Sequence, residues 1–318
     1  MTMPSATRWP VEALERHLGR GRLLRDVPLA RYTTFKIGGP VDLFFRARTV
    51  DELVTALGAA RELGVPTFLL GMGANILVGD RGIRGLVVRN ETSRIEFLDD
   101  TRVRADSGVL VFHDLIQATV QRGLGGLHHF VGIPSTVGGA LWQNLHFLSP
   151  PPARERTVFI GEVTEACDVL TEDGQIRTLG REELAFGYDD SVFHHRPWVA
   201  LRATFRLQPQ NIEDLRYVIR ENLAWRDERH PDLWLYPCAG SIFKKIEGVG
   251  AGRLIDQVGL KGYVLGNAAF FHKHANIIVN LGGATAADVR ALMALAQERV
   301  ARQLGYQLEP EIVLVGEF

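Results

Sequence analysis

The chain has 318 residues, of which 46% are hydrophobic and 23% are charged, and its formal net charge is −1. This length suits two or three packed modules, and the composition is ordinary for a soluble globular protein. A general nucleic-acid binder usually carries a basic surplus, so the charge balance argues against nucleic acid as a partner. A local basic pocket for a small phosphorylated ligand stays compatible with it.

Two cysteines, Cys167 and Cys238, lie far apart in the sequence. They exclude a disulfide framework and give no zinc-type spacing, so we expect no metal site. The N-terminal stretch MTMPSATRWPVEALERHLGR lacks the apolar run of a signal peptide, and no window approaches the roughly 18 apolar residues of a membrane span. We therefore expect a cytoplasmic protein without a membrane segment.

Helices and strands are mixed in the first part of the chain. Helical spacing of apolar residues occurs at 11–19 (VEALERHLG), 50–64 (VDELVTALGAARELG) and 113–124 (HDLIQATVQRGL). Short apolar runs at 66–71 (PTFLLG) and 85–89 (GLVVR) predict strands. This mixture excludes an all-α or all-β fold.

The second part of the chain continues the mixture. A strand-like run (LRATFRL) is followed by a break near Pro209–Asn211 and a long predicted helix at 212–228. A helix predicted at 285–305 opens with Thr285 and Asp288 in capping-box spacing and closes on a glycine. The stretch EIVLVG at 311–316 predicts a last strand.

Gly71 and Gly73 lie in LLGMGANILVGD (69–80), directly after a predicted strand. A G-x-G pair after a strand invites a Rossmann interpretation, but ILV leads straight into a Gly-Asp turn and leaves no room for the helix of that fold. We predict strand, tight loop and strand, with backbone N–H groups able to hold phosphate oxygens. A plain turn is the alternative.

A second glycine loop occurs in VGIPSTVGGALWQN (131–144). Pro134 fixes one dihedral angle, Ser135 and Thr136 offer hydroxyls, and Gly138-Gly139 lets the backbone approach a ligand closely. Either loop alone is unremarkable. Together they favour a clamp on a long diphosphate, and therefore a dinucleotide ligand.

Three further stretches carry candidate functional groups. Ser241 in YPCAGSIFKK has no local histidine and lies outside any G-x-S-x-G motif, so a turn hydroxyl is the default interpretation. Glu311 alternates with Val313 and Val315 in the last strand, and an inward carboxylate there needs a partner or a raised pKa. FGYDDSVFHH (186–195) is either part of a catalytic centre or a polar surface turn.

These segments, taken in order, resemble the UDP-N-acetylenolpyruvoylglucosamine reductase family, whose members use FAD in peptidoglycan precursor synthesis. The matching stretches run from about residue 30 to the C-terminus: YTTFKIGGPVDLFF, LGMGANILVGDRGIRGLVV, GLGGLHHFVGIPSTVGGALWQN, FGYDDSVF, CAGSIFKK, AGRLIDQVGLKGYVLGNAAFFHKHANIIVNLGGATAADV and LEPEIVLVG. Single motifs are weak, whereas the ordered set is specific. The chain is similar to the shorter form of the family.

The resemblance implies an α+β fold in three parts. These are an N-terminal helical extension (1–30), a two-lobed FAD-binding domain of the vanillyl-alcohol-oxidase (PCMH) type (31–208) and an α+β substrate-binding domain (209–318) whose last strand returns toward the flavin. The resemblance also implies FAD as cofactor, NADPH as reductant and a nucleotide sugar, UDP-N-acetylglucosamine enolpyruvate, as the small-molecule substrate. It leaves the oligomeric state open.

By motif position, the resemblance implies Ser241 as proton donor and Glu311 as acidic partner of an enolate-like intermediate, with Lys244 a candidate to support the serine. The residues implied at the FAD loops are Gly71, Gly73, Ala74, Asn75, Ile76 and Leu77 in the first and Gly132, Ile133, Pro134, Gly138 and Gly139 in the second. Those implied on the substrate side are Tyr188, Arg229 and Lys261.

The sharpest departure from the family pattern is Asp189, which stands where Tyr-Arg-x-Ser-x-Phe has its arginine. Three interpretations stay open. Another cation, Arg196, His194 or His195, takes the place of the arginine; Asp189 turns outward; or the chain has kept the fold and changed or lost the reaction. A flavoprotein with an altered substrate is therefore the alternative function.

Other departures lie near the expected substrate and flavin edge. Leu145-His146 replaces the usual Ala-Gly, Lys245 stands where asparagine is usual, and Phe271 replaces a small polar residue. The motifs of the two cofactor loops keep the family pattern.

Overall fold

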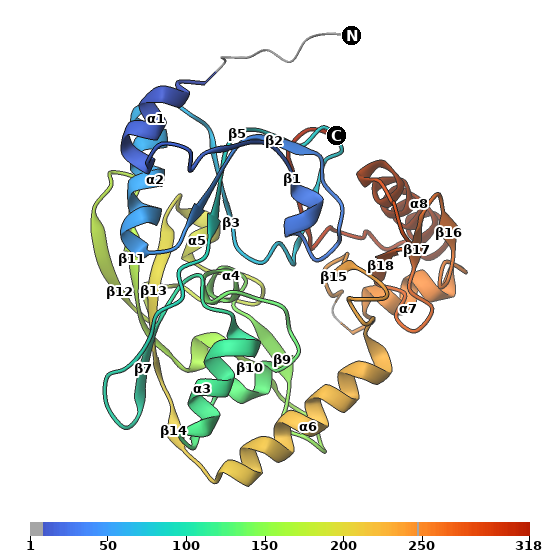
Figure 1. The fold of residues 1–318 in the computed structure, drawn as a ribbon. Coiled ribbons are helices and arrows are strands. Elements are labelled where there is room, and N and C mark those ends of the chain that lie inside the picture. The colour runs from blue at the N-terminus through green and yellow to red at the C-terminus, as the bar shows by residue number, and fades with distance from the viewer. Residues whose placement is uncertain (1–8, 247) are drawn as a thin grey trace, which may run out of the picture.

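The computed structural model describes residues 9–246 and 248–318. The first lobe is a four-stranded sheet in the order β1-β2-β5-β3. Its strands are β1 (Leu24–Pro28), β2 (Pro40–Ala47), β3 (Thr67–Leu70) and β5 (Ile83–Asn90). Strand β5 runs parallel to β2 and β3, and β1 is the antiparallel edge strand. Helices α1 (Val11–Leu18) and α2 (Val50–Glu62) lie together on one side of this sheet (Figure 1).

The N-terminal segment is part of this lobe. Residues 1–8 of the predicted extension lie outside the described residues. Helix α1 forms where predicted, and its Leu14 and Leu18 are buried in the same hydrophobic core as Leu53 of α2. Strand β1 was not predicted, because its sequence LRDVP is largely polar. It forms by hydrogen bonding to β2, so the segment up to residue 30 is not purely helical.

The second lobe is built on an antiparallel five-stranded sheet in the order β12-β11-β13-β7-β6. Its strands are β6 (Ile95–Phe97), β7 (Arg102–Asp106), β11 (Thr164–Leu170), β12 (Ile176–Gly180) and β13 (Val199–Arg206). Around it lie α3 (Ile116–Gln121), α4 (Val137–Trp142), α5 (Val192–His195) and the pairs β9 (His146–Leu148) with β10 (Thr157–Phe159) and β8 (Leu124–Gly125) with β14 (Gln208–Pro209). The helix predicted at 113–124 is shorter, because residues 111–115 form a π-helical turn before α3.

Helix α6 (Ile212–Arg229) leads from the second lobe to a third unit (Figure 1). That unit is a four-stranded sheet of β15 (Cys238–Ser241), β18 (Ile277–Asn280), β17 (Ala268–Phe270) and β16 (Val264–Leu265), packed against α7 (Ala251–Gln257) and α8 (Ala286–Leu304). The predicted capping box of α8 is confirmed. Thr285 accepts from the N–H of Asp288, whose carboxylate accepts from the N–H of Thr285, and Gly305 ends the helix in a left-handed conformation.

The last strand, β19 (Val313–Val315), leaves the third unit and pairs in parallel with β4 (Ile76–Val78). Strand β4 directly follows the first glycine loop, as the predicted strand–loop–strand requires. Phe35, Ile37 and Leu77 of the N-terminal part are buried in the core of the third unit. The C-terminal end of the chain is therefore fixed beside the first lobe.

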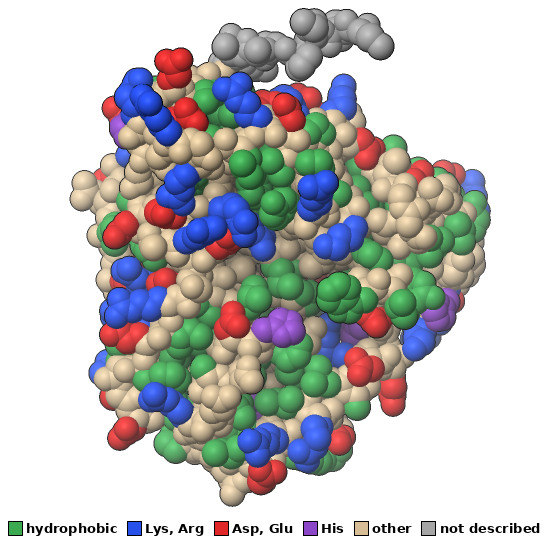
Figure 2. All heavy atoms as spheres, in the orientation of Figure 1, with side chains coloured by type: hydrophobic (Ala, Val, Ile, Leu, Met, Phe, Trp, Pro, Cys, Tyr) green, Lys and Arg blue, Asp and Glu red, His purple; other side chains and the backbone are tan. Residues whose placement is uncertain are grey.

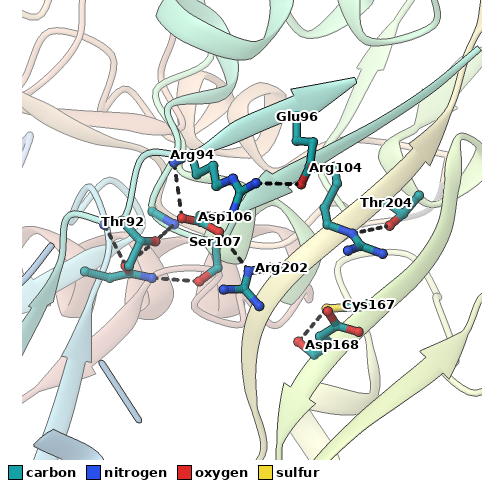
Figure 3. Close-up of polar contacts among 12 residues, drawn as sticks. Thr92, Arg94, Glu96, Arg104, Asp106, Ser107, Cys167, Asp168, Arg202 and Thr204 are labelled. Atoms are coloured by element: carbon teal, nitrogen blue, oxygen red, sulfur yellow. Dashed lines mark hydrogen bonds and ion pairs between the residues drawn. The ribbon is translucent and has the colours of Figure 1, made fainter. Parts of the chain in front are cut away.

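A buried polar network connects the two lobes where β5 and β7 end (Figure 3). Asn90 donates to Ser107 Oγ at 2.8 Å and accepts from the hydroxyl of Thr92 at 2.9 Å. Asp106 accepts from the N–H of Arg94 at 3.1 Å and from Arg202 Nε at 3.2 Å. The carbonyl of Ser107 then accepts from the N–H of Gly138. The network thus fixes the second glycine loop relative to the first lobe.

Candidate active site

A cavity of about 1550 Å³ lies where the three units meet. Every predicted cofactor residue except Leu77 lines it: Gly71, Gly73, Ala74, Asn75, Ile76, Gly132, Ile133, Pro134, Gly138 and Gly139. Ser241, Glu311 and Tyr188 line it as well. On the face drawn in Figure 2, hydrophobic side chains gather near the middle, and acidic and basic side chains are intermingled around them.

The first glycine loop presents unpaired backbone donors to this cavity. Among the described residues, the N–H groups of Met72, Gly73 and Ala74 make no hydrogen bond within the protein. Gly73 has a φ of +66°, and a Cβ there would lie 2.6 Å from the carbonyl oxygen of Tyr32. The position therefore requires glycine, and the loop can offer its N–H groups to phosphate oxygens.

The second glycine loop lies directly against the first. A Cβ at Gly71 would lie 2.8 Å from Thr136 Oγ1, which accepts from the N–H of Gly139 at 3.2 Å and caps α4. A Cβ at Gly138 would lie 3.2 Å from Ser107. Glycine at Gly71 thus allows the two loops to pack directly against each other, and glycine at Gly138 allows the second loop to pack against Ser107. The free donors of the first loop and a cavity of about 1550 Å³ fit a dinucleotide such as FAD.

Backbone pairing brings Ser241 and Glu311 to one wall of the cavity. The N–H of Glu311 donates to the carbonyl of Ile242, the residue after Ser241, at 2.8 Å. Asn276 holds the same strand by accepting from the N–H of Phe243 and donating to its carbonyl. Two residues far apart in the sequence therefore line the same cavity.

Glu311 is mostly removed from water. Burial, and then the negative charge of Asp189, raise the pKa of Glu311 to about 8, although Lys244 acts in the opposite direction. At neutral pH the side chain is therefore a protonated carboxylic acid that can donate a hydrogen bond. Burial also raises the pKa of Tyr188 to about 12, with Asp189 and Glu311 contributing. Both groups are proton donors facing the cavity.

The two carboxylates of FGYDDSVFHH have different environments. Asp190 has 41% of its side chain exposed and forms an ion pair with His195 at 2.9 Å. Asp189 has 10% exposed and lines the cavity, with its backbone in the left-handed region at a φ of +52°. The stretch is thus a surface turn at Asp190 and a wall of the candidate active site at Asp189. The interpretation that Asp189 turns outward is wrong.

The cations named from sequence do not pair with Asp189. His195 binds Asp190, and His194 stacks on Trp142 with ring centroids 3.6 Å apart. Arg196 lines the cavity, but its guanidinium lies 5.8 Å from the ring centre of Trp198.

Two cavity residues were missed as functional candidates. His146 Nδ1 lies 3.5 Å from Asp189 Oδ1, and Lys245 also lines the cavity. The sequence contained a signal for both residues, because His146 and Lys245 each depart from the family pattern near the expected substrate edge.

Three predicted site residues lie outside the cavity lining. Leu77 is fully buried in the core of the third unit. Arg229 donates to Glu228 at 2.5 Å and to the carbonyl of Trp225, and Lys261 forms an ion pair with Asp256 at 3.1 Å. Arg229 and Lys261 can therefore contact a substrate only outside this cavity.

The fold and the cavity define a dinucleotide-binding enzyme of the FAD type. The C-terminal part of the chain supplies the cavity wall that carries Ser241 and Glu311. Residues 40–180 match the family model of the FAD binding domain. Residues 231–315 match the model described as UDP-N-acetylenolpyruvoylglucosamine reductase, C-terminal domain.

Relatives over nearly the whole chain agree with these matches. A UDP-N-acetylenolpyruvoylglucosamine reductase of Rubrobacter xylanophilus is 43% identical over 92% of this chain and 95% of its own length. That of Moorella thermoacetica is 42% identical over 93% and 94%. The crystal structure of the reductase from Thermus caldophilus superposes with a TM-score of 0.75, at 33% identity, over 92% of this chain and 98% of that one.

The chain therefore belongs to the UDP-N-acetylenolpyruvoylglucosamine reductase family. The predicted fold class is confirmed, with an FAD-binding domain followed by the family's own C-terminal domain. Within residues 9–246 and 248–318, no helix is long and apolar enough to cross a bilayer. The same residues contain no cluster of three or more side chains suited to hold a metal ion.

The contact between the two glycine loops gives a test of the cofactor site. Gly71→Ala places a methyl group against Thr136, so we expect the purified protein to lose most of its flavin while keeping its far-ultraviolet circular dichroism. Gly58→Ala is the matched control, because a Cβ there meets no atom within 4 Å and should leave flavin content unchanged. The measurement is the ratio of absorbance at flavin and protein wavelengths. Full flavin content in Gly71→Ala would contradict the assignment.

Proposed function

We propose that the protein is an NADPH-dependent FAD enzyme that reduces UDP-N-acetylglucosamine enolpyruvate to UDP-N-acetylmuramate. This reaction belongs to peptidoglycan precursor synthesis, a cytoplasmic process that supports cell shape and division. The observation that carries the proposal is the convergence of Ser241 and Glu311 on a cavity walled by both glycine loops. Bound FAD supplies a carrier for the hydride that passes from NADPH to the enolpyruvyl methylene carbon.

The two domains have separate roles in this proposal. Residues 31–208 bind FAD, and residues 209–318 bind the nucleotide sugar, with the last strand returning to the cofactor loop. Tyr188 contacts substrate within the cavity. Arg229 and Lys261 contact the more distant parts of the extended substrate. Breaking their present ion pairs costs little, because both side chains are solvent-exposed.

Charge development explains why this wall suits the reaction. Hydride addition to the methylene carbon places negative charge on the adjacent carbon and its carboxylate. Glu311, protonated at neutral pH, donates a hydrogen bond to this carboxylate, and a preorganised donor of this kind lowers the barrier. Ser241 then delivers the proton to the carbon that bears the ether oxygen. Its hydroxyl makes no hydrogen bond within the described residues, so it is free to face the substrate.

Asp189 supports one alternative function. A carboxylate in the cavity wall disfavours a second carboxylate nearby, which argues for a flavoprotein that acts on a less acidic substrate. Reoxidation of the reduced flavin by a panel of uncharged enol ethers and enones separates this alternative from the first proposal. Faster reoxidation by these compounds than by the enolpyruvyl nucleotide would favour the alternative.

The first test uses the purified wild-type holoenzyme with NADPH. We expect NADPH oxidation to depend on UDP-N-acetylglucosamine enolpyruvate and to yield a product heavier by two hydrogens, measured by absorbance and mass spectrometry. The corresponding nucleotide sugar without the enolpyruvyl group is the control and should give no oxidation. The same absence of oxidation with the enolpyruvyl compound would overturn the proposed function.

Ser241→Ala tests the assignment of the proton donor. We expect reduction of the flavin by NADPH to stay within twofold of wild type, because this serine is not needed for that half-reaction. Reoxidation of the reduced flavin by the enolpyruvyl substrate should slow by about 10²- to 10⁴-fold, the usual contribution of a positioned acid. Stopped-flow single turnovers measure each step. Ser93→Ala, at an exposed site outside the cavity, is the control.

Glu311 gives a prediction about pH. Its raised pKa means that the donating acid form is present below about pH 8 and is lost as the pH rises through that value. Reoxidation of the flavin by substrate should therefore decline above pH 8 in wild type. Glu311→Gln keeps a donor at every pH, so the decline should disappear although the rate is lower. Glu309→Gln, at an exposed neighbour paired with Lys244, should keep the decline. An unchanged profile in Glu311→Gln would show that another group sets it.

A further inference from the structure

His146 and Asp189 form a pair whose polar atoms are not satisfied inside the protein. His146 begins β9, and Asp189 lies in the left-handed turn before α5; both line the cavity. Their Nδ1 and Oδ1 atoms are 3.5 Å apart, which is close enough for attraction and too long for a good hydrogen bond. Both atoms are buried without a hydrogen-bond partner among the described residues.

Such groups are unusual, because buried polar atoms in folded proteins are almost always hydrogen-bonded. The surroundings of His146 also restrict the ring to one region. Its centroid lies 4.8 Å from that of Tyr188 and 5.3 Å from that of Phe159. An aromatic clamp around an unsatisfied imidazole at the cavity wall is an arrangement that a ligand completes. A proton on Nδ1, donated to Asp189 Oδ1, would satisfy both buried atoms and leave Nε2 as the ring nitrogen that can donate to a ligand oxygen.

The charges that face this pair come from several elements. Asp189 is beside the ring, Glu311 lies before β19, and Lys245 follows β15. Tyr188 and His194 are further titratable neighbours of Asp189, and Lys244 acts on Glu311. The charged groups that act on the pKa of His146 or Glu311 are the carboxylate of Asp189 and the lysines Lys244 and Lys245. A substrate carboxylate that enters next to Asp189 gains a further positive charge if His146 is protonated.

We propose that His146, oriented by Asp189, binds the carboxylate of the enolpyruvyl substrate and becomes protonated as that carboxylate arrives. This inference rests on the proposed function and names the residue that supplies positive charge to the reacting end of the substrate. Asp189 accepts a hydrogen bond from the imidazolium and fixes its orientation, so Asp189 is a positioning residue. The proton comes from solvent, and no covalent bond to the protein forms.

The free and bound states differ in proton content. Burial lowers the pKa of His146 and Lys245 lowers it further, whereas Asp189 and the backbone of Asn144 raise it. The net shift is downward, so the ring is mostly neutral at pH 7 in the free protein. An adjacent substrate carboxylate favours the charged form. Binding at pH 7 therefore takes up a proton at His146, while Glu311 is already protonated.

The first experiment measures this uptake by calorimetry. Oxidised holoenzyme is titrated with UDP-N-acetylglucosamine enolpyruvate at pH 7 in two buffers that differ in ionisation enthalpy. We expect uptake of about one proton per substrate in wild type and close to none in His146→Gln, which should bind at least about tenfold more weakly. His129→Gln is the matched control, because His129 is a mostly buried histidine that bonds Ser149 and does not line the cavity.

The second experiment separates binding from folding and from the role of Lys245. His146→Gln should keep its flavin content and its rate of reduction by NADPH, and should slow reoxidation by substrate at least about tenfold. Asp189→Asn should give part of this loss, and the double variant should be no worse than His146→Gln, because the two residues act as one unit. If His146→Gln fails to fold, Asp189→Asn still tests the inference by its own partial loss.

The outcomes are distinguishable. Proton uptake and affinity that persist in His146→Gln, or losses that add in the double variant, overturn the inference while the proposed function stands. The same holds if Lys245→Met alone abolishes the uptake and His146→Gln does not. A wild-type enzyme that neither binds the enolpyruvyl nucleotide nor is reoxidised by it overturns the proposed function and this inference together.

Discussion

Two backbone hydrogen bonds between segments far apart in the sequence position Ser241 and Glu311 in the candidate site. The N–H of Val313 donates to the carbonyl of Asn75 at 3.0 Å, and the N–H of Glu311 donates to Ile242 at 2.8 Å. The first bond fixes the C-terminal strand beside the cofactor loop, and the second fixes it beside Ser241. Because peptide geometry is rigid, these two bonds place an acid and a hydroxyl against the glycine loop. Side-chain contacts alone would leave them free to move apart.

This placement raises the pKa of Glu311, and the proposed reaction uses the resulting carboxylic acid. Glu311 lies in a mostly buried space that Asp189 also faces, and burial first and then this neighbouring carboxylate disfavour the charged form of Glu311. Glu311 holds its proton, and so the wall presents an acid to the substrate where an isolated surface glutamate would present an anion. Asp189 Oδ1 lies 3.5 Å from His146 Nδ1. Burial and the charge of Asp189 thus lower the stability of the folded protein as the pH rises from about 4.5 to 8, and they keep the donor protonated over the same range.

Local signals in the sequence predicted the elements that depend on local interactions. Helix α8 has its capping box and terminal glycine, and the loop between β3 and β4 has too few residues for a helix. Strand β1 was missed because it depends on pairing with β2 and not on its own polar sequence. Strand β19 is shorter than the predicted 311–316, because pairing with β4 covers only Val313–Val315. The wall residues Ser241 and Glu311 came from motif position, and no local pattern assigns them.

The function of Asp189 was not readable from its own segment, because its partners come from other elements. The resemblance implied a positive charge at this position, a small residue at 146 and an amide at 245. The chain has Asp189, His146 and Lys245, and the pKa of His146 responds to both of the others, so the three departures are neighbours in space. Arginine, glycine and asparagine carry a net charge of +1; aspartate, imidazolium and lysine also carry +1. The local charge that favours a bound carboxylate is therefore restored only when His146 is protonated, which makes the charge of this wall depend on the ligand.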